Sequence, residues 1–335
     1  PLSPHTPEAV PAADGERVRR TLREEGYVVI RGAASAAEVD ELTNGLWSWL
    51  ERCSTMRRDA IETWGGYPGE PTHGQLIFGD VGQAPFAWRA RTLPGVLAAF
   101  EAAWGLPPGA PLLTSFDGAA AFRPPQHDPT WATEPALRWL HVDQNAHKAG
   151  LCALQGALLL YDQDAASGGL VVLPRSHLRH NDLTGGGSER PGVDFVPLRA
   201  ADKRLAGLEA RLVCAAAGDL LLWDSRTVHA SQGADPAAPM PRDEGGRPRL
   251  ARAAAYVCMV PAEPHLAADP KLGERRAHSV AHHITTTHWP QDNRLTSQGS
   301  DTPDLTKLDR LGAEARALVY GLPREVGAAG VVDVE

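Results

Sequence analysis

Apolar residues in the first hundred positions recur at the spacing of amphipathic helices. Three helices are predicted there, over Asp14–Glu25, directly after Ser35, and over Pro94–Trp104. Ser35 with Glu38 three residues later is typical of a capping box, in which each side chain bonds the other's backbone. Between the first two helices, Tyr27–Arg31 has the β-branched, apolar character of a buried strand.

Beyond about residue 112, the pattern changes to short apolar runs separated by Gly, Pro, Asp and Ser. Many short strands with turn residues between them predict a sandwich or barrel, and Asp304–Tyr320 is then predicted to be a closing helix. We expect a single domain over 1–335, with N-terminal helices in 14–105, a β-core over about 112–260 and a helical extension over 261–335. The predicted core strands are Leu112–Phe116, Trp139–Asp143, Leu151–Tyr161, Leu170–Leu173, Arg211–Cys214, Asp219–Trp223 and Ala251–Val260.

Two stretches of this chain are predicted to be loops, Asn181–Pro191 and the Pro- and Gly-rich Asp235–Pro248. Long loops in compact domains are often functional. The second loop is therefore either a cover over a binding site or a solvated hairpin without a role, and the sequence leaves both alternatives open.

Composition and charge narrow the function. A chain of 335 residues with 43% hydrophobic and 22% charged residues is typical of a folded protein with a substantial core. A net charge of -8 without a cluster of Lys and Arg argues against nucleic acid and anionic membranes as partners. Its apolar runs are too short to span a bilayer. Four scattered cysteines without a CxxC motif predict free thiols in a reducing cytoplasm, and abundant Ala and Arg predict a bacterial source.

The candidate chemistry is concentrated in a His-x-Asp sequence, His141-Val142-Asp143. Residues two apart on a strand point to the same face, so this imidazole and carboxylate would lie side by side. His229, which follows the strand Asp219–Trp223, is the best candidate for a second histidine. Two histidines and one carboxylate that leave positions open are typical of non-heme Fe(II) oxygenases. The sequence therefore predicts an iron site at His141, Asp143 and His229.

A second His-x-Asp sequence, His180-Asn181-Asp182, is a weaker candidate for the same role. It lies in a polar stretch before Gly185 and Gly186, where no strand would hold two side chains parallel. We therefore expect it to be a solvated loop.

The order of several segments resembles the phytanoyl-CoA dioxygenase-like family of Fe(II)/2-oxoglutarate oxygenases. The resemblance covers about residues 16 to 260. It implies a double-stranded β-helix (a cupin-like jelly roll), mainly β with flanking helices. The segments that carry it are 25–32 (EGYVVIRG), 141–143 (HVD), 168–177 (GGLVVLPRSH), 218–223 (GDLLLW), 229–231 (HAS) and the strand that Arg252 opens.

The family's properties imply roles for individual residues. His141, Asp143 and His229 would hold Fe(II), with three positions left for 2-oxoglutarate and O2. Arg252 occupies the position of the basic residue that pairs with the far carboxylate of 2-oxoglutarate, and Ser231 would assist it. Arginine suits this role because it binds a carboxylate through two parallel hydrogen bonds.

The sequence departs from the family pattern between His229 and Arg252, because the insertion Asp235–Pro248 lengthens that interval. Arg242, Arg247 and Arg249 are therefore rivals for the carboxylate partner. Arg252 is preferred because it lies in an apolar strand, where a charged residue needs a partner.

Other polar residues near these motifs are weaker candidates. Gln155 interrupts the apolar run Leu151–Tyr161, and it either faces 2-oxoglutarate or makes a structural hydrogen bond. Ser115 and Asp117 could line the mouth of the site, or form a turn at Asp117-Gly118. Further candidates without an assigned mechanism are Trp139, Asn145, His147 and His288-Trp289-Pro290.

These observations predict an Fe(II)- and 2-oxoglutarate-dependent dioxygenase that hydroxylates a C–H bond of a small molecule. Desaturation and ring formation would use the same residues, whereas halogenation is disfavoured because Asp143 occupies the position that a halide would need. The alternatives are a jelly-roll protein that binds metal without catalysis and a metalloenzyme that does not use 2-oxoglutarate. A hydrolase is disfavoured because the chain has no Gly-x-Ser-x-Gly motif.

Overall fold

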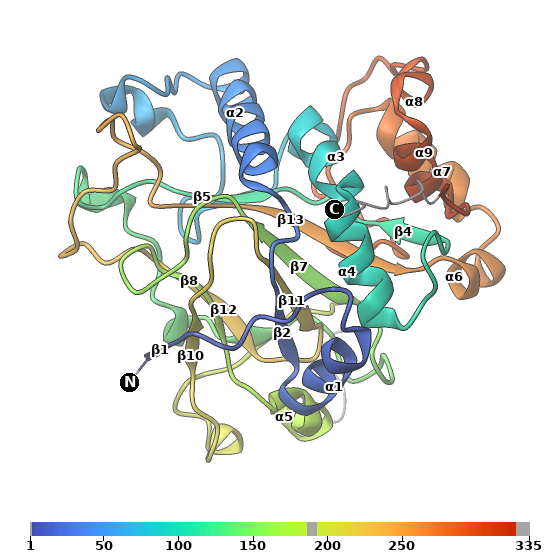
Figure 1. The fold of residues 1–335 in the computed structure, drawn as a ribbon, viewed down its shortest axis with the longest axis horizontal. Coiled ribbons are helices and arrows are strands. Elements are labelled where there is room, and N and C mark those ends of the chain that lie inside the picture. The colour runs from blue at the N-terminus through green and yellow to red at the C-terminus, as the bar shows by residue number, and fades with distance from the viewer. Residues whose placement is uncertain (1, 186–192, 326–335) are drawn as a thin grey trace, which may run out of the picture.

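The strands of the computed structural model, which describes residues 2–185 and 193–325, form two sheets whose inner faces pack together (Figure 1). The seven-stranded sheet, which we call the major sheet, has the order β2-β11-β7-β13-β5-β3, with β4 also paired to β13. Its strands are β2 (Tyr27–Ile30), β3 (Gln75–Leu76), β4 (Leu112–Thr114), β5 (Ala119–Phe122), β7 (Leu154–Leu159), β11 (Leu220–Asp224) and β13 (Arg252–Pro261).

The six-stranded sheet, which we call the minor sheet, has the order β1-β10-β8-β12-β6-β9. Only its β1 pairs in parallel among the strands described, and all other pairs are antiparallel. Its strands are β1 (Ser3–His5), β6 (His141–Val142), β8 (Gly169–Val172), β9 (Val196–Pro197), β10 (Arg211–Val213) and β12 (His229–Gln232).

From β6 onward the chain passes back and forth between the two sheets, from β6 to β7 to β8, and later from β10 to β11, β12 and β13. Neighbours in each sheet are therefore distant in sequence, as in a jelly roll. The predicted fold class, a double-stranded β-helix with flanking helices, is confirmed.

Alternation along the major-sheet strands separates a helix-covered face from a face that looks toward the minor sheet. On β7, Leu154 and Leu158 belong to the helix-covered cluster, whereas Ala157 and Leu159 face the minor sheet. Gly156 has no room for a side chain, because a Cβ there would lie 2.6 Å from the carbonyl oxygen of Val257.

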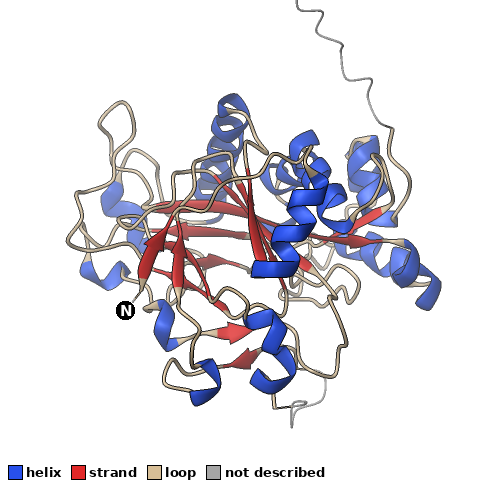
Figure 2. Cartoon of the chain, turned by 60° about the horizontal axis from the view of Figure 1, so that its bottom comes forward, coloured by secondary structure: helices blue, strands red, loops and turns tan. Residues whose placement is uncertain are grey.

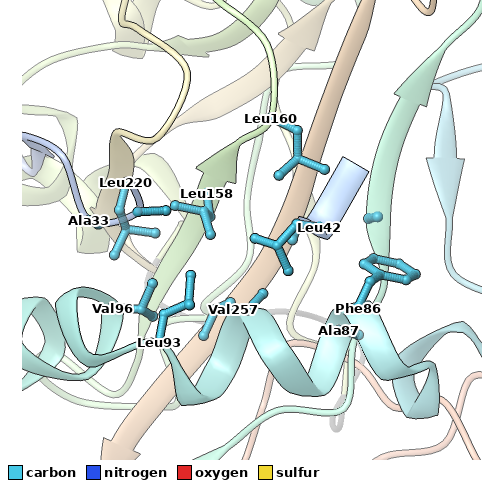
Figure 3. Close-up of a cluster of buried hydrophobic side chains, with 14 of the residues drawn as sticks. Ala33, Leu42, Phe86, Ala87, Leu93, Val96, Leu158, Leu160, Leu220 and Val257 are labelled. Carbon is cyan, nitrogen blue, oxygen red and sulfur yellow. The ribbon is translucent and has the colours of Figure 1, made fainter. Parts of the chain in front are cut away.

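The N-terminal helices cover the outer face of the major sheet. Figure 3 shows side chains of this cluster, including Leu158, Leu220 and Val257 of the sheet, beside residues of the covering helices. The predicted capping box at Ser35 is present, and Gly26 ends the first helix with a φ of 82° before β2 begins. These helices are α1 (Gly15–Glu25), α2 (Ala36–Cys53), α3 (Pro85–Thr92) and α4 (Pro94–Trp104).

Of the other α-helices in the described ranges, four lie in the C-terminal region beside α3 and α4 (Figures 1 and 2). The prediction of one helix over Asp304–Tyr320 is wrong, because the extended backbone at Leu311 and Gly312 separates two helices. None of the helices in the described ranges is long and apolar enough to cross a bilayer. These other helices are α5 (His180–Leu183), α6 (Glu263–Ala268), α7 (Leu272–Ala281), α8 (Lys307–Arg310) and α9 (Ala313–Tyr320).

Arg276 on α7 attaches the C-terminal region to the β-core. Its guanidinium group is fully buried and donates hydrogen bonds to the backbone oxygens of Thr114 in β4 (2.6 Å), Pro290 (2.7 Å) and Val319 in α9 (2.8 Å). The segment around Pro290 is thereby held against the major sheet.

Candidate metal centre and active-site cavity

His141, Asp143 and His229 meet at the inner face of the minor sheet. His141 of β6 and His229 of β12 are direct partners in the antiparallel ladder, and Asp143 follows β6 immediately. Possible ligand atoms of the three side chains all lie within 4.8 Å of one another. The carboxylate oxygens of Asp143 lie 3.2 Å from Nε2 of His229 and 3.8 Å from Nε2 of His141.

Both imidazole rings are oriented by backbone carbonyl groups. Nδ1 of His141 lies 2.9 Å from the carbonyl oxygen of Trp139, and Nδ1 of His229 lies 2.9 Å from that of Thr227. Because a carbonyl oxygen only accepts, Nδ1 carries the hydrogen in each ring and Nε2 keeps its lone pair for a metal. Burial and the neighbouring His229 lower the pKa of His141 to about 4, so this ring is neutral at physiological pH.

Asp143 is the negative charge of the cluster. Burial alone would raise its pKa, but His288, His141 and His229 hold the pKa well below its usual value. Gln155 donates a hydrogen bond from Nε2 to Oδ2 of Asp143 at 2.9 Å, which fixes the orientation of the carboxylate. Two imidazole rings that present Nε2 and one oriented carboxylate fit the ligand set that Fe(II) requires.

The cluster opens into a cavity of about 520 Å³ between the two sheets. Its wall combines residues from both sheets with residues from the segment that follows α7. Several rings lie close to the cluster, including Phe195 with its ring centroid 4.7 Å from that of His141. Residues that line the cavity include Asp117, Trp139, Gln155, Phe195, Trp223, Ser231, Arg252, Tyr256, Thr286, Thr287, His288 and Thr296.

Arg252 supplies a buried positive charge to this cavity, with 2% of its surface exposed. Its Nε donates to Oε1 of Gln163 at 3.0 Å, and its guanidinium group also interacts with Tyr256. Nη1 has no hydrogen-bond partner among residues 2–185 and 193–325. Within the described residues no carboxylate pairs with it. Burial accordingly lowers its pKa, against the opposing effect of Tyr256. An unpaired guanidinium nitrogen in a cavity fits the carboxylate of 2-oxoglutarate.

Residues 22–235 match the family described as phytanoyl-CoA dioxygenase (PhyH). The chain belongs to the phytanoyl-CoA dioxygenase family. The predicted membership is thus confirmed, and the protein is an Fe(II)- and 2-oxoglutarate-dependent oxidoreductase. The matched range contains His141, Asp143 and His229 but ends before Arg252 and before the segment that follows α7.

A curated relative and several solved structures are similar to this member of the family. The "Ava biosynthesis cluster protein O" of Aspergillus versicolor is 28% identical over 291 residues, which are 81% of this chain and 85% of the relative. The epimerase SnoN from nogalamycin biosynthesis is 20% identical, with a TM-score of 0.49, over 75% of this chain and 84% of SnoN. EctD from S. alaskensis with bound Fe is 17% identical, with a TM-score of 0.47, over 78% of this chain and 80% of EctD.

The two weaker cosubstrate candidates of this phytanoyl-CoA dioxygenase family member occupy different parts of the cavity. Ser231 lies two residues after His229 on β12 and lines the cavity. Gln155 also lines it, but its amide donates to Asp143, so the structural hydrogen bond is the alternative that the geometry favours. Its role in holding 2-oxoglutarate stays a prediction.

The rival arginines make contacts outside the cavity. Arg242 donates to the backbone oxygen of Gly246, and Arg247 pairs with Asp243. Arg249 lies over the ring of Tyr161, 4.4 Å from its centroid. None of the three lines the cavity, in contrast to Arg252.

The loop Asp235–Pro248 also lies apart from the cavity, since none of its residues lines it. It folds back on itself through a bridge between Arg242 and Pro248, and Arg247 reaches Asp59 at 3.3 Å. Of the two alternatives for this loop, the geometry favours the solvated hairpin over the cover of a binding site.

The second His-x-Asp sequence does not form a metal cluster in the described structure. The expectation of a solvated loop is wrong for His180, which is buried in α5 and lies 2.5 Å from the backbone oxygen of Gln144. The ring therefore packs against the backbone of the loop after β6. The rest of the predicted loop at 186–191 lies outside the described residues.

Several residues that line the cavity could not be assigned a role from the sequence alone. Trp223 and Tyr256 lie on β11 and β13, where strand alternation alone could have placed them on the inner face. Phe195 lies just before β9 and carries no recognisable motif. His288 was a candidate without a mechanism, and its Nε2 lies 4.0 Å from Oδ2 of Asp143. Asn145 and His147 do not line the cavity.

Proposed function

We propose that this enzyme uses Fe(II), 2-oxoglutarate and O2 to hydroxylate an unactivated C–H bond of a small molecule. The observation that carries the proposal is that one cavity contains both the His-Asp-His cluster and the unpaired guanidinium nitrogen of Arg252. Bound iron, with 2-oxoglutarate and O2, would supply the oxidising power for C–H hydroxylation, with release of succinate and CO2.

The residues of the chain would divide the work of binding and orientation. His141, Asp143 and His229 would hold the iron, and Gln155 would keep Asp143 in its binding orientation. Arg252 would bind the far carboxylate of 2-oxoglutarate. Ser231 and the unpaired indole N–H of Trp223 are further donors on the cavity wall.

The cavity supports a small-molecule substrate. A volume of about 520 Å³ lies within the range of sites for cofactors and metabolites. Trp139 and Phe195 would contact the apolar part of the substrate. The relative named for a biosynthesis cluster supports a role in making or modifying a metabolite.

We further propose that residues 1–335 act as one oxygenase domain, because the two sheets share one inner cluster. The unpaired state of all four cysteines supports the expected reducing cytoplasm. A bacterial source stays a prediction.

The test is a screen for small molecules that stimulate succinate formation by the purified protein with Fe(II), 2-oxoglutarate and O2. We expect stimulation by at least one metabolite and incorporation of one oxygen atom from O2 into it. Asp143→Gly should abolish succinate formation. Tight Fe(II) binding without any 2-oxoglutarate binding would refute this proposal and favour a metalloprotein of another kind.

A further inference from the structure

The segment that follows α7 forms a rigid side wall of the cavity. Thr286 and Phe116 share two hydrogen bonds. The backbone N–H of Thr286 donates to the carbonyl oxygen of Phe116 at 2.9 Å, and the backbone N–H of Phe116 donates to the Thr286 hydroxyl at 3.0 Å. Thr287 donates its backbone N–H to Arg294 at 2.8 Å, and Trp289 is buried. Thr286, Thr287 and His288 therefore face the cavity from a fixed backbone.

Two polar atoms of this wall lack a hydrogen-bond partner within the described chain. These are Oγ1 of Thr287 and Nε2 of His288. The hydroxyl of Thr296, another lining residue, is in contrast bonded to the backbone oxygen of Ile77 at 2.8 Å. Buried polar atoms in proteins are almost always hydrogen-bonded, so an unpaired set beside a cavity indicates a ligand. His288 Nε2 is also close to the metal cluster, 4.0 Å from Oδ2 of Asp143.

Asp117 adds a buried carboxylate beside these atoms. Ser115, two residues before it, bonds the backbone of Cys258 on β13, and Cys258 is the ladder partner of Gln155, which donates to Asp143. Asp117 lines the same cavity as His288, and its carboxylate interacts electrostatically with that imidazole. It is 7% exposed, lines the cavity, and accepts a hydrogen bond from the Ser115 hydroxyl at 2.6 Å.

A carboxylate makes this wall unsuitable for the acidic ends of 2-oxoglutarate, which it would repel. It would instead accept a hydrogen bond from a donor. We propose that Asp117, Thr287 and His288 form a substrate subsite, which binds an O–H or N–H group near the carbon to be oxidised. The inference rests on the proposed function and names the substrate class as a small molecule with an apolar body and a hydrogen-bond donor.

The test uses the full-length protein loaded with Ni(II), which supports no turnover, and with 2-oxoglutarate. Four probes of one shape are titrated by ligand-observed NMR: benzyl alcohol, benzylamine, benzyl methyl ether and benzoate. A hydrogen bond to a charged group strengthens binding by about tenfold or more. We therefore expect the alcohol or the amine to bind about tenfold more tightly than the ether, and benzoate to bind most weakly. The stronger of the two donors tells whether the subsite prefers a hydroxyl or an ammonium group.

Substitutions test whether the preference for donor probes comes from Asp117, Thr287 and His288. Asp117→Asn and Thr287→Val should each reduce the donor-to-ether ratio several-fold, and His288→Ala should weaken both donor probes. Thr296→Val is the matched control, because its hydroxyl is already bonded, and it should leave the ratio unchanged. Thr287→Val keeps the shape of the side chain, so it tests the subsite even if Asp117→Asn folds poorly.

Equal binding of donors and ether, no binding of either donor at millimolar concentration, or an unchanged ratio in Thr287→Val would overturn the subsite. The same samples report Ni(II) and 2-oxoglutarate binding. If the wild-type protein does not bind Ni(II) and 2-oxoglutarate, the proposed function is refuted instead. The two failures are therefore distinguishable.

Discussion

Replacing Arg252 by methionine separates the binding of 2-oxoglutarate from the stability of the fold. Methionine keeps the apolar length of the side chain but removes the guanidinium group. In the free protein this change removes the hydrogen bond to Gln163, worth about 1 kcal/mol. It also removes the interaction with Tyr256 and a contact 5.0 Å from the Phe122 ring centroid. It also removes a buried charge that no carboxylate balances in the described structure. We therefore expect the free energy of unfolding to change by no more than about 1 kcal/mol.

The effect of Arg252→Met on 2-oxoglutarate should be much larger. Removing one partner of a buried charge pair costs about 3–5 kcal/mol, which corresponds to a loss of affinity of roughly two to three and a half orders of magnitude. At a 2-oxoglutarate concentration one hundred times the wild-type Kd, binding stabilises the wild-type protein by about 2.7 kcal/mol. The same concentration should stabilise the variant by less than about 0.5 kcal/mol.

The assay is anaerobic thermal unfolding of the metal-loaded protein over a series of 2-oxoglutarate concentrations, with calorimetric titration for Kd. Arg249→Ala is the control, because Arg249 lies over Tyr161 outside the cavity. It should bind 2-oxoglutarate like the wild type. Wild-type affinity in Arg252→Met, or a large loss in Arg249→Ala, would show that another residue binds the far carboxylate.

Four further results are expected. His229→Ala should lose most Fe(II) binding and all succinate formation while its circular dichroism stays native, and full turnover would contradict its role as a ligand. Gln155→Leu should weaken metal binding by about 10- to 100-fold, measured by competition with a chelator, because Asp143 loses the donor that orients it. Lys148→Met should destabilise the protein by about 2 kcal/mol in denaturant titrations, since its ammonium group bridges Asp194 and Asp292 at 3.0 and 2.8 Å; the exposed Lys271→Met is its control. Replacing 236–246 by a short Gly/Ser link should leave substrate KM and the ratio of succinate to product unchanged, and uncoupling would show that the loop closes over the cavity in solution.

Much of the β-core of the protein could be predicted because apolar runs in its sequence are separated by turn residues. Each predicted strand overlaps an observed one. The strands that were missed are short or lack β-branched residues, such as β9 with two residues and the alanine-rich β5. The strand expected before His229 ends at Asp224, and His229 instead begins β12 after a turn.

His141 and Asp143 could be named together from the sequence because a spacing of two residues is a local property. His229 could be named only as a histidine that follows a strand, since its pairing with His141 joins strands distant in sequence. The hydrogen bond from Gln155 to Asp143 could not be predicted, because it depends on the pairing of strands distant in sequence. The position of His288 beside Asp143 also could not be predicted. It depends on tertiary contacts of its segment, such as the hydrogen bond from Arg276 to Pro290, which no local sequence pattern indicates.

Within the described residues, Arg276 donates four hydrogen bonds that all end on backbone oxygens, two of them in α9 and the others at Thr114 and Pro290. Every residue type offers such an oxygen, so this attachment places no demand on neighbouring side chains. Positions 287 and 288 can therefore change identity while the main chain keeps its course. A randomised library at these two positions should be rich in folded proteins with new substrate preferences, which makes the segment a natural starting point for directed evolution.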